Sequence, residues 1–200
     1  MPKMPEGVEE GIIRGMYKLS TVEGATGSAS ASGKDKLHVQ LFGSGAILRS
    51  VQQAQKLLAE KFGVGSTVWS VTSYKHLRRS AQACRRRNML HPNQRPHVSY
   101  IEQQLDGVEG PFIAASDHVR AVAEQIDPWV PGGLYALGTD GFGRSETRAN
   151  LRRHFEVDAQ SIAIAALYRL AEQGKFDRAR LAAAIEDLGI NPEKSDPQFA

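Results

Sequence analysis

Cysteine is nearly absent from this sequence, in which Cys84 is the only one among 200 residues. A single thiol cannot close an intrachain disulfide, and it cannot supply the thiolates of a structural zinc site or an iron–sulfur cluster. Such cysteine usage is typical of a reducing compartment, and we expect a cytoplasmic protein. A chain of this length buries roughly 70% of the surface that its unfolded form exposes, so one large domain needs neither a disulfide nor a metal for stability.

Long apolar runs are missing as well. No stretch approaches the about eighteen apolar residues of a membrane-spanning helix, and the N-terminal MPKMPEGVEEG has no apolar signal-peptide core. Neither membrane insertion nor secretion is predicted. Residues 1–11 combine two prolines, two glycines and three glutamates, which is a linker composition. We therefore predict a linker over 1–11 and a single domain over 12–200.

Acidic residues are absent from one long segment. Between Lys75 and Ile101 there is no Asp or Glu, whereas seven residues are basic: Lys75, Arg78, Arg79, Arg85, Arg86, Arg87 and Arg95. The net charge of the chain, +3, is too small to predict a polyanionic partner by itself. Such a run is most often a solvated helix face; an acidic protein partner is the second interpretation, and nucleic acid is the least favoured.

Nucleotide-binding signatures are incomplete. The stretch VQLFGSGAIL (39–48) has the strand, glycine turn and helix start that present N–H groups to a phosphate. However, Leu48 stands where a dinucleotide fingerprint has its third glycine, and the later strand VWSVTS ends without the acid that holds a ribose. A tight turn is favoured. Because a helix N-terminus keeps a partial positive charge, we retain Gly43, Ser44 and Gly45 as a candidate anion-binding site.

Metal and nucleophile motifs are also lacking. The six histidines show no i, i+4 pairing and no H-E-x-x-H, and no G-x-S-x-G occurs, so no metal site and no catalytic serine are predicted. In NMLHP (88–92), Asn88 and His91 flank apolar residues ahead of Pro92, which holds the chain extended. A hydrogen-bonded structural histidine is favoured there, and both residues are kept as candidates for facing an active centre.

Alternating apolar patterns predict an α/β fold. Strand patterns cover 15–21, 36–43, 66–72, 111–116 and 134–139, and helical patterns cover 46–62, 74–87, 117–126, 145–155, 161–174 and 176–189. Repeated strand–helix units indicate a three-layer domain with a mixed, mostly parallel sheet covered on both faces. We expect the first two strands to form an antiparallel edge hairpin whose Gly/Ser/Ala tip is 22–35.

The segment GTDGFGRSE (138–146) is the strongest candidate for a functional site. Asp140-Gly141 is a turn pair, Gly143 is expected to take a conformation closed to other residues, and Ser145 is expected to cap a helix that begins at Glu146. Local physics does not explain Phe142, which lies beyond a parallel strand, where such sheets place binding sites. We therefore predict an interface loop with a neighbouring domain or subunit, consisting of Asp140, Gly141, Phe142, Gly143, Arg144 and Ser145.

The helix after this loop supplies arginines. Arg148, Arg152 and Arg153 are expected on its outer surface, where a guanidinium can form bidentate pairs with carboxylates across an interface.

Several of these stretches together resemble one family. GTDGFGRSETRANLRRHFEVD, NMLHP, LFGSGAILRSV, GVGSTVWSVTSY and MPEGVEEGIIRGMYKL are similar to the C-terminal domain of the homodimeric, thiamine-diphosphate-dependent pyruvate dehydrogenases. The resemblance runs from Met4 to Ala200, and D-x-F-G-x-S alone resembles a loop of transketolases. It implies a transketolase C-terminal-domain-like fold. The sequence departs from the family in its arginine-rich segment 75–87.

The resemblance also implies what the chain does. The family decarboxylates pyruvate oxidatively and transfers acetyl to lipoyl groups, but its thiamine diphosphate and Mg²⁺ are held by preceding domains through G-D-G and Asn-Asn motifs, which this sequence lacks. No catalytic residue or cofactor is therefore implied here. The implied role is dimer and domain packing, with the N-terminal and middle domains, a second copy and dihydrolipoyl transacetylase as partners. The alternative is a stand-alone module that uses 75–95 to bind an acidic protein or RNA.

Overall fold

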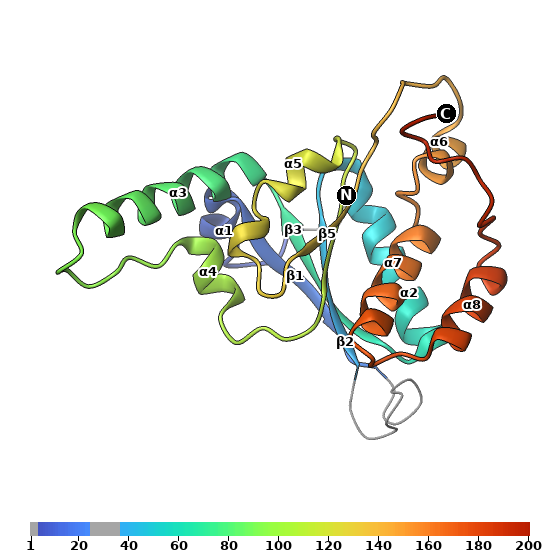
Figure 1. Cartoon of the computed structure of the whole chain (residues 1–200), viewed down its shortest axis with the longest axis horizontal. Helices are drawn as coiled ribbons and strands as arrows, with labels where there is room; N and C mark the ends of the chain where they lie inside the picture. The colour runs from blue at the N-terminus through green and yellow to red at the C-terminus, as the bar shows by residue number, and fades with distance from the viewer. Residues whose placement is uncertain (1–3, 25–36) are drawn as a thin grey trace.

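The computed structural model of the protein describes residues 4–24 and 37–200. Five strands form one sheet in the order β1-β3-β2-β4-β5 (Figure 1). Their bounds are β1 Met16–Val22, β2 His38–Gly43, β3 Gly65–Val71, β4 Phe112–Ala115 and β5 Leu134–Leu137. The strands β3, β2, β4 and β5 run parallel to one another and β1 is antiparallel to β3, which confirms the mixed, mostly parallel sheet with an antiparallel edge strand.

The predicted hairpin between the first two strands is wrong. β1 pairs with β3, from Met16 opposite Val71 to Val22 opposite Ser66, and β3 lies between β1 and β2. The reason is topological: the crossover from β2 through a helix places β3 beside β2, so β1 adds to the outer edge of β3. Residues 25–35 of the predicted hairpin tip lie outside the described part of the chain.

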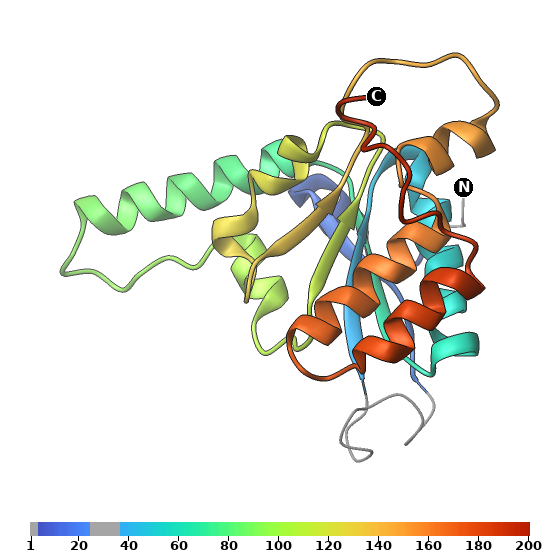
Figure 2. The same ribbon diagram turned by 45° about the vertical axis from the view of Figure 1, so that its right-hand side comes forward.

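Helices cover both faces of the sheet, which confirms the three layers (Figure 1, Figure 2). One face packs against α2 (Leu48–Phe62), α7 (Ala159–Glu172) and α8 (Arg178–Asp187). The other face carries α1 (Glu9–Arg14), α3 (Tyr74–Leu90), α4 (Tyr100–Leu105) and α5 (Arg120–Glu124), with the short 3₁₀ helix η2 (Asp127–Trp129). The short η1 (Gly45–Ile47) precedes α2, and α6 (Arg148–His154) lies at the carboxyl end of the sheet.

Two apolar cores result, one on each face. On the first, α7 buries Ile162, Ala166 and Leu170 at helical spacing, and its first turn is capped by the Asp158 carboxylate, which accepts from Ser161 N–H at 2.9 Å. On the second, Phe42 packs edge-to-face against two other aromatic rings at centroid distances of 6.3 and 5.7 Å: those of Trp69 and Phe112. The central strands are buried on both faces, as parallel strands between helix layers must be.

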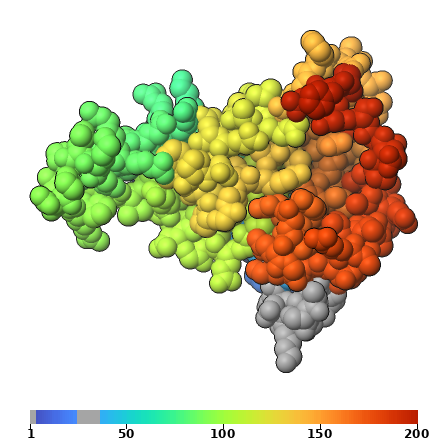
Figure 3. Space-filling model, in the orientation of Figure 1, coloured from blue at the N-terminus to red at the C-terminus, as the bar shows by residue number. Residues whose placement is uncertain are grey.

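The helix α3 extends beyond the sheet and the chain returns alongside it, forming a lobe that projects from the body (Figure 1, Figure 3). We call residues 74–99 the α3 arm. At its N-terminus, Ser73 caps the helix by accepting from His76 N–H at 3.1 Å. Near its tip, the Asn88 side chain donates to the His97 carbonyl at 2.9 Å and accepts from the His97 N–H at 2.8 Å. These two hydrogen bonds fasten the returning segment to the helix.

The predicted boundary between linker and domain, at residues 11 and 12, falls inside the helix α1. Described residues of the predicted linker 1–11 enter α1 at Glu9, and Gly11 is buried against the Tyr100 side chain. The domain limits 12–200 stay a prediction. Within residues 4–24 and 37–200, no helix combines the length and apolar content needed to cross a bilayer.

Candidate functional site

The candidate site lies at the carboxyl ends of the parallel strands. The chain leaves β2 towards α2 on one face of the sheet and leaves the adjacent β4 towards α5 on the other, so the two loops diverge. Open α/β sheets bind ligands at such a switch point. The loop after β5, residues 138–147, lies on the same edge and completes the region.

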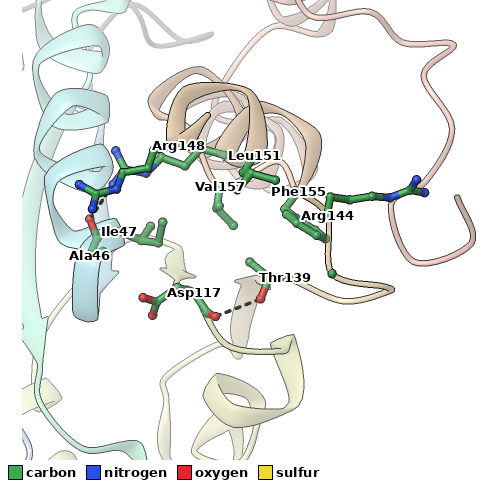
Figure 4. A pocket seen from close by; sticks show the side chains of 11 residues that line it. Ala46, Ile47, Asp117, Thr139, Arg144, Arg148, Leu151, Phe155 and Val157 are labelled. Carbon is green, nitrogen blue, oxygen red and sulfur yellow. Dashed lines mark hydrogen bonds between the residues drawn. The ribbon is translucent and has the colours of Figure 1, made fainter. Parts of the chain in front are cut away.

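A pocket of about 510 Å³ occupies this edge (Figure 4). Its floor is apolar and comes from η1, α6 and the start of the next segment: Ile47, Leu151, Phe155 and Val157. Its rim is polar and includes Asp117, Thr139, Arg144, Arg148 and Arg152. The Thr139 hydroxyl donates to the Asp117 carbonyl at 3.0 Å and so ties the loop after β5 to the loop after β4.

The predicted interface loop is anchored at its first residue. The Asp140 carboxylate accepts from both the backbone N–H and the Nε of Arg120, each at 3.0 Å. Burial lowers the pKa of Arg120, but the hydrogen bond and charge of Asp140, together with the charges of Asp196 and Glu124, outweigh it and raise that pKa above its ordinary value. The pair fixes the loop to the start of α5.

Gly141 is the glycine that this loop requires. Its φ is 102°, and a Cβ there would collide with the Pro197 carbonyl. The prediction that Gly143 needs an unusual conformation is wrong, because its φ is not positive and a Cβ would meet nothing within 4 Å. The chain reverses at Gly141 because the C-terminal segment passes directly beside it.

Replacing Gly141 with alanine is therefore expected to lower the free energy of unfolding by about 1–3 kcal/mol, since it adds backbone strain and a clash with Pro197. Gly143→Ala is the matched control and should change stability by less than about 0.5 kcal/mol. Urea denaturation of both proteins measures the difference. Equal stability of the two variants would contradict the close approach of loop and C-terminal segment.

Phe142, at the tip of the loop, is 81% exposed. The neighbouring C-terminal segment carries Phe199, which is 83% exposed, and its Gln198 side chain accepts from Arg120 Nη2 at 3.3 Å. Two exposed phenylalanines thus occur on adjacent segments (Figure 1, Figure 2). We call Phe142, Phe199 and the supporting Asp140 and Gly141 the Phe142 surface. Sequence reasoning missed Phe199, because no local pattern connects it to the loop.

The helix after the loop begins later than predicted. Thr147 is its N-cap and accepts from Asn150 N–H at 3.3 Å, so Ser145 does not cap it and Glu146 lies outside it. Both serine and threonine can cap a helix, so the sequence alone did not decide between them, and the two-residue difference lengthens the exposed loop.

The arginines of α6 are mostly used inside the chain, contrary to expectation. Arg153 pairs with Asp158 at 3.2 Å and donates to the Gly189 carbonyl, and Arg152 donates to the Ala46 carbonyl at 3.4 Å. Among residues 4–24 and 37–200, Arg148 has no hydrogen bond or ion pair. The guanidinium of Arg144 points away from the pocket (Figure 4).

The candidate anion-binding turn has a negative group beside it. The Asp117 carboxylate lies beside Gly45, so close that a Cβ on Gly45 would be 2.7 Å from its Oδ1 atom. The Ser44 N–H already donates to the Ala115 carbonyl at 3.3 Å. The Ser44 hydroxyl is buried and has no hydrogen-bond partner within the described part of the chain. Anion binding at Gly43, Ser44 and Gly45 stays a prediction, and the charge of Asp117 opposes it.

The candidates Asn88 and His91 lie in the α3 arm, which projects away from α6, one of the elements that line the pocket (Figure 1). Both polar ends of the Asn88 amide are occupied by His97, and His91 is an exposed C-cap residue. The arm also exposes Met89, Leu90 and Val98, at 71%, 50% and 54%. Its surface is therefore apolar as well as basic, and facing an active centre stays a prediction for both residues.

No metal site is formed by the described residues 4–24 and 37–200, since no three His, Cys, Asp or Glu side chains gather there. The ligand set that Mg²⁺ prefers, several carboxylate and carbonyl oxygens, is not assembled in this part of the chain. The described residues therefore do not fit a metal-bound diphosphate, and no reaction step is assigned to them.

Comparison with known proteins assigns the chain to a family. The profile described as "Transketolase-like TK C-terminal domain" matches residues 15–158, and the chain belongs to this family. A transketolase from Pichia stipitis, solved in complex with sedoheptulose 7-phosphate, superposes with a TM-score of 0.50 at 18% identity over 84% of this chain and 20% of that one. At that identity the likeness shows the fold alone.

Curated relatives are considerably more similar in sequence. The pyruvate dehydrogenase E1 component of Escherichia coli (strain K12) is 48% identical over 201 residues, which cover all of this chain and 21% of the relative. The corresponding component of Pseudomonas aeruginosa is 50% identical over 197 residues, or 98% of this chain and 21% of the relative. The chain thus matches the C-terminal transketolase-like domain of pyruvate dehydrogenase E1 components and spans about a fifth of the length of these relatives.

Proposed function

We propose that the chain is the C-terminal docking domain of a pyruvate dehydrogenase E1 component, which positions the catalytic domains and packs the dimer and does not catalyse the reaction alone. The observation that carries the proposal is Phe142, an 81% exposed aromatic ring on a loop that Asp140 and Gly141 hold in place. An exposed aromatic ring on a rigid loop is well suited to bind a partner protein surface, because little conformational entropy of the loop is lost on binding.

In the complete enzyme, the remaining four fifths would hold thiamine diphosphate and Mg²⁺ and would decarboxylate pyruvate, passing the acetyl group to lipoyl groups. The partners of this chain would be those preceding domains, a second copy of the enzyme and dihydrolipoyl transacetylase. The match at 48% identity over the whole chain supports these assignments, since it extends through the Phe142 loop and the α3 arm.

The α3 arm provides a second docking surface in this proposal. It projects from the body (Figure 3) and combines exposed Met89, Leu90 and Val98 with arginines, one of which, Arg85, lies over the Trp129 ring at 4.8 Å. Protein interfaces typically have an apolar core and are enriched in methionine and arginine. The exposed apolar side chains Met89, Leu90 and Val98 favour a protein partner over a nucleic acid, whose recognition is mainly polar and electrostatic.

Isolated, the chain is expected to show no turnover with pyruvate, thiamine diphosphate, Mg²⁺ and an artificial electron acceptor, whereas the E. coli E1 component under the same conditions is the positive control. The physical reason is that the described residues form no metal-binding group. Absorbance of the reduced acceptor measures the rate. Turnover by the chain alone, at a rate above that of a heat-denatured sample, would refute the docking role.

The alternative, a stand-alone nucleic-acid or acidic-protein module, predicts a different result. RNA would then retard the chain in a salt-dependent way, and replacing Arg85, Arg86 and Arg87 together with glutamate would abolish the complex. The docking proposal expects no such retardation at physiological salt.

A further inference from the structure

The pocket at the carboxyl end of the sheet has opposite charges on its two sides. Figure 4 shows Arg148 on one side of the cavity and Asp117 on the other, where Thr139 lies beside Asp117 and apolar side chains separate the two charged groups. The guanidinium of Arg152 joins the positive side, because it reaches the Ala46 carbonyl of η1. The pocket is therefore polarised along one direction.

The positive side has unused hydrogen-bonding capacity. Arg148 has no partner among the described residues, and Arg152 makes one long hydrogen bond of 3.4 Å, which leaves most of its N–H groups available. Two neighbouring guanidiniums with free N–H groups present the fork geometry that binds a carboxylate or phosphate bidentately. An anionic group would be held at this side of the pocket.

The floor requires an apolar ligand body. Ile47, Leu151, Phe155 and Val157 line it, and the volume of about 510 Å³ lies within the range of small-molecule sites. Inorganic phosphate or a small hydrophilic acid would leave this floor uncovered. An aromatic or branched aliphatic group would cover it.

The negative side limits the charge of the ligand. The Asp117 side chain makes no hydrogen bond or ion pair within residues 4–24 and 37–200, so its charge acts on whatever occupies the pocket. A phosphate monoester carries about −1.5 to −2 at neutral pH and a carboxylate carries −1. The repulsion from Asp117 therefore favours a single carboxylate placed at the arginine side.

We propose that this pocket binds a monocarboxylate with a compact aromatic or branched apolar body, with the carboxylate on Arg148 and Arg152 and the uncharged end towards Asp117. All the residues that line this pocket belong to this chain. It goes beyond the docking function and does not depend on it.

The first test is an NMR titration of the ¹⁵N-labelled 200-residue chain with 3-phenylpropionate, with the neutral 3-phenylpropanol as its matched control. We expect saturable shifts at the pocket residues with a dissociation constant of about 1 mM or tighter, and binding of the alcohol at least about tenfold weaker. Arg148→Gln should weaken binding of the acid about tenfold, because charge-assisted hydrogen bonds are lost. The matched variant Arg79→Gln, on the exposed face of α3, should bind as the parent does.

The second test uses the charge of Asp117. A dicarboxylate with the same skeleton and a second carboxylate at the para position, 3-(4-carboxyphenyl)propionate, should bind at least about tenfold more weakly than 3-phenylpropionate, and Asp117→Asn should reduce or remove this difference. Because this variant is expected to gain affinity for the dicarboxylate, a loss of folding cannot imitate the result.

Three outcomes would overturn the proposal. One is the absence of saturable shifts at the pocket up to 10 mM acid, roughly ten times the expected dissociation constant. Another is equal affinity of the parent and Arg148→Gln proteins for 3-phenylpropionate. A third is a set of pocket shifts that grow with protein concentration without ligand, since these would assign the pocket to an interface between copies.

Discussion

Phe42→Ala is expected to lower the free energy of unfolding by about 3–5 kcal/mol, the largest stability loss that we predict for a single substitution. Phe42 is fully buried on the central strand β2, and its ring packs edge-to-face with those of Trp69 and Phe112. Removing it leaves a cavity between the sheet and the helix layer that contains α3 and α5. Natural domains have about 5–15 kcal/mol of stability, so this loss takes a large fraction of the total.

Phe142→Ala is the matched control for this prediction, because it removes the same side chain from an 81% exposed position. It should change the stability of the isolated chain by no more than about 0.5 kcal/mol. Urea denaturation followed by circular dichroism gives both values. If Phe142→Ala is as destabilising as Phe42→Ala, the ring contributes to the domain's own core and does not serve a partner.

Phe142→Asp is expected to have its effect in the complete enzyme. The suitable protein is a chimera in which this chain replaces the matching 201 residues of the E. coli E1 component, to which it is 48% identical. Placing a carboxylate in a desolvated interface costs several kcal/mol when nothing pairs with it, so pyruvate oxidation should fall at least about tenfold. Phe142→Tyr, which keeps the ring, should retain most of the activity.

The readouts of that experiment separate docking from folding. The isolated Phe142→Asp chain should keep the parental circular dichroism spectrum and unfolding midpoint, while the chimera loses activity and dimerises more weakly in sedimentation. Unchanged activity and dimerisation of the chimera would show that Phe142 meets no essential partner surface.

Much of the fold was predictable because strand and helix periods are local signals. The buried strand β3 reads as a continuous apolar and small run, and α7 shows apolar residues at helical spacing over its whole length. The sequence analysis predicts no helix at the short α4, although Ser99 and Glu102 form a capping box, a pattern that is visible in the sequence. The pairing of β1 with β3 was not predictable in this way, since it joins segments separated by a helix and a strand.

The candidate site was predictable only in part, for the same reason. The loop around Phe142 is recognisable because an aromatic between two glycines has no local packing role. The pocket is not, because Ile47 and Leu151 are brought together by the sheet edge and not by the sequence. The contact of Gly141 with Pro197, which explains the glycine, is equally remote along the chain.

Hydrogen–deuterium exchange of the Phe142 surface, compared between the isolated chain and the chimera, tests the docking role most directly. We predict slower exchange at residues 140–145 and 196–199 in the chimera, with little change in the exposed face of α8. Equal exchange of these two segments in both proteins would contradict the account, since the surface would then stay open to solvent in the complete enzyme.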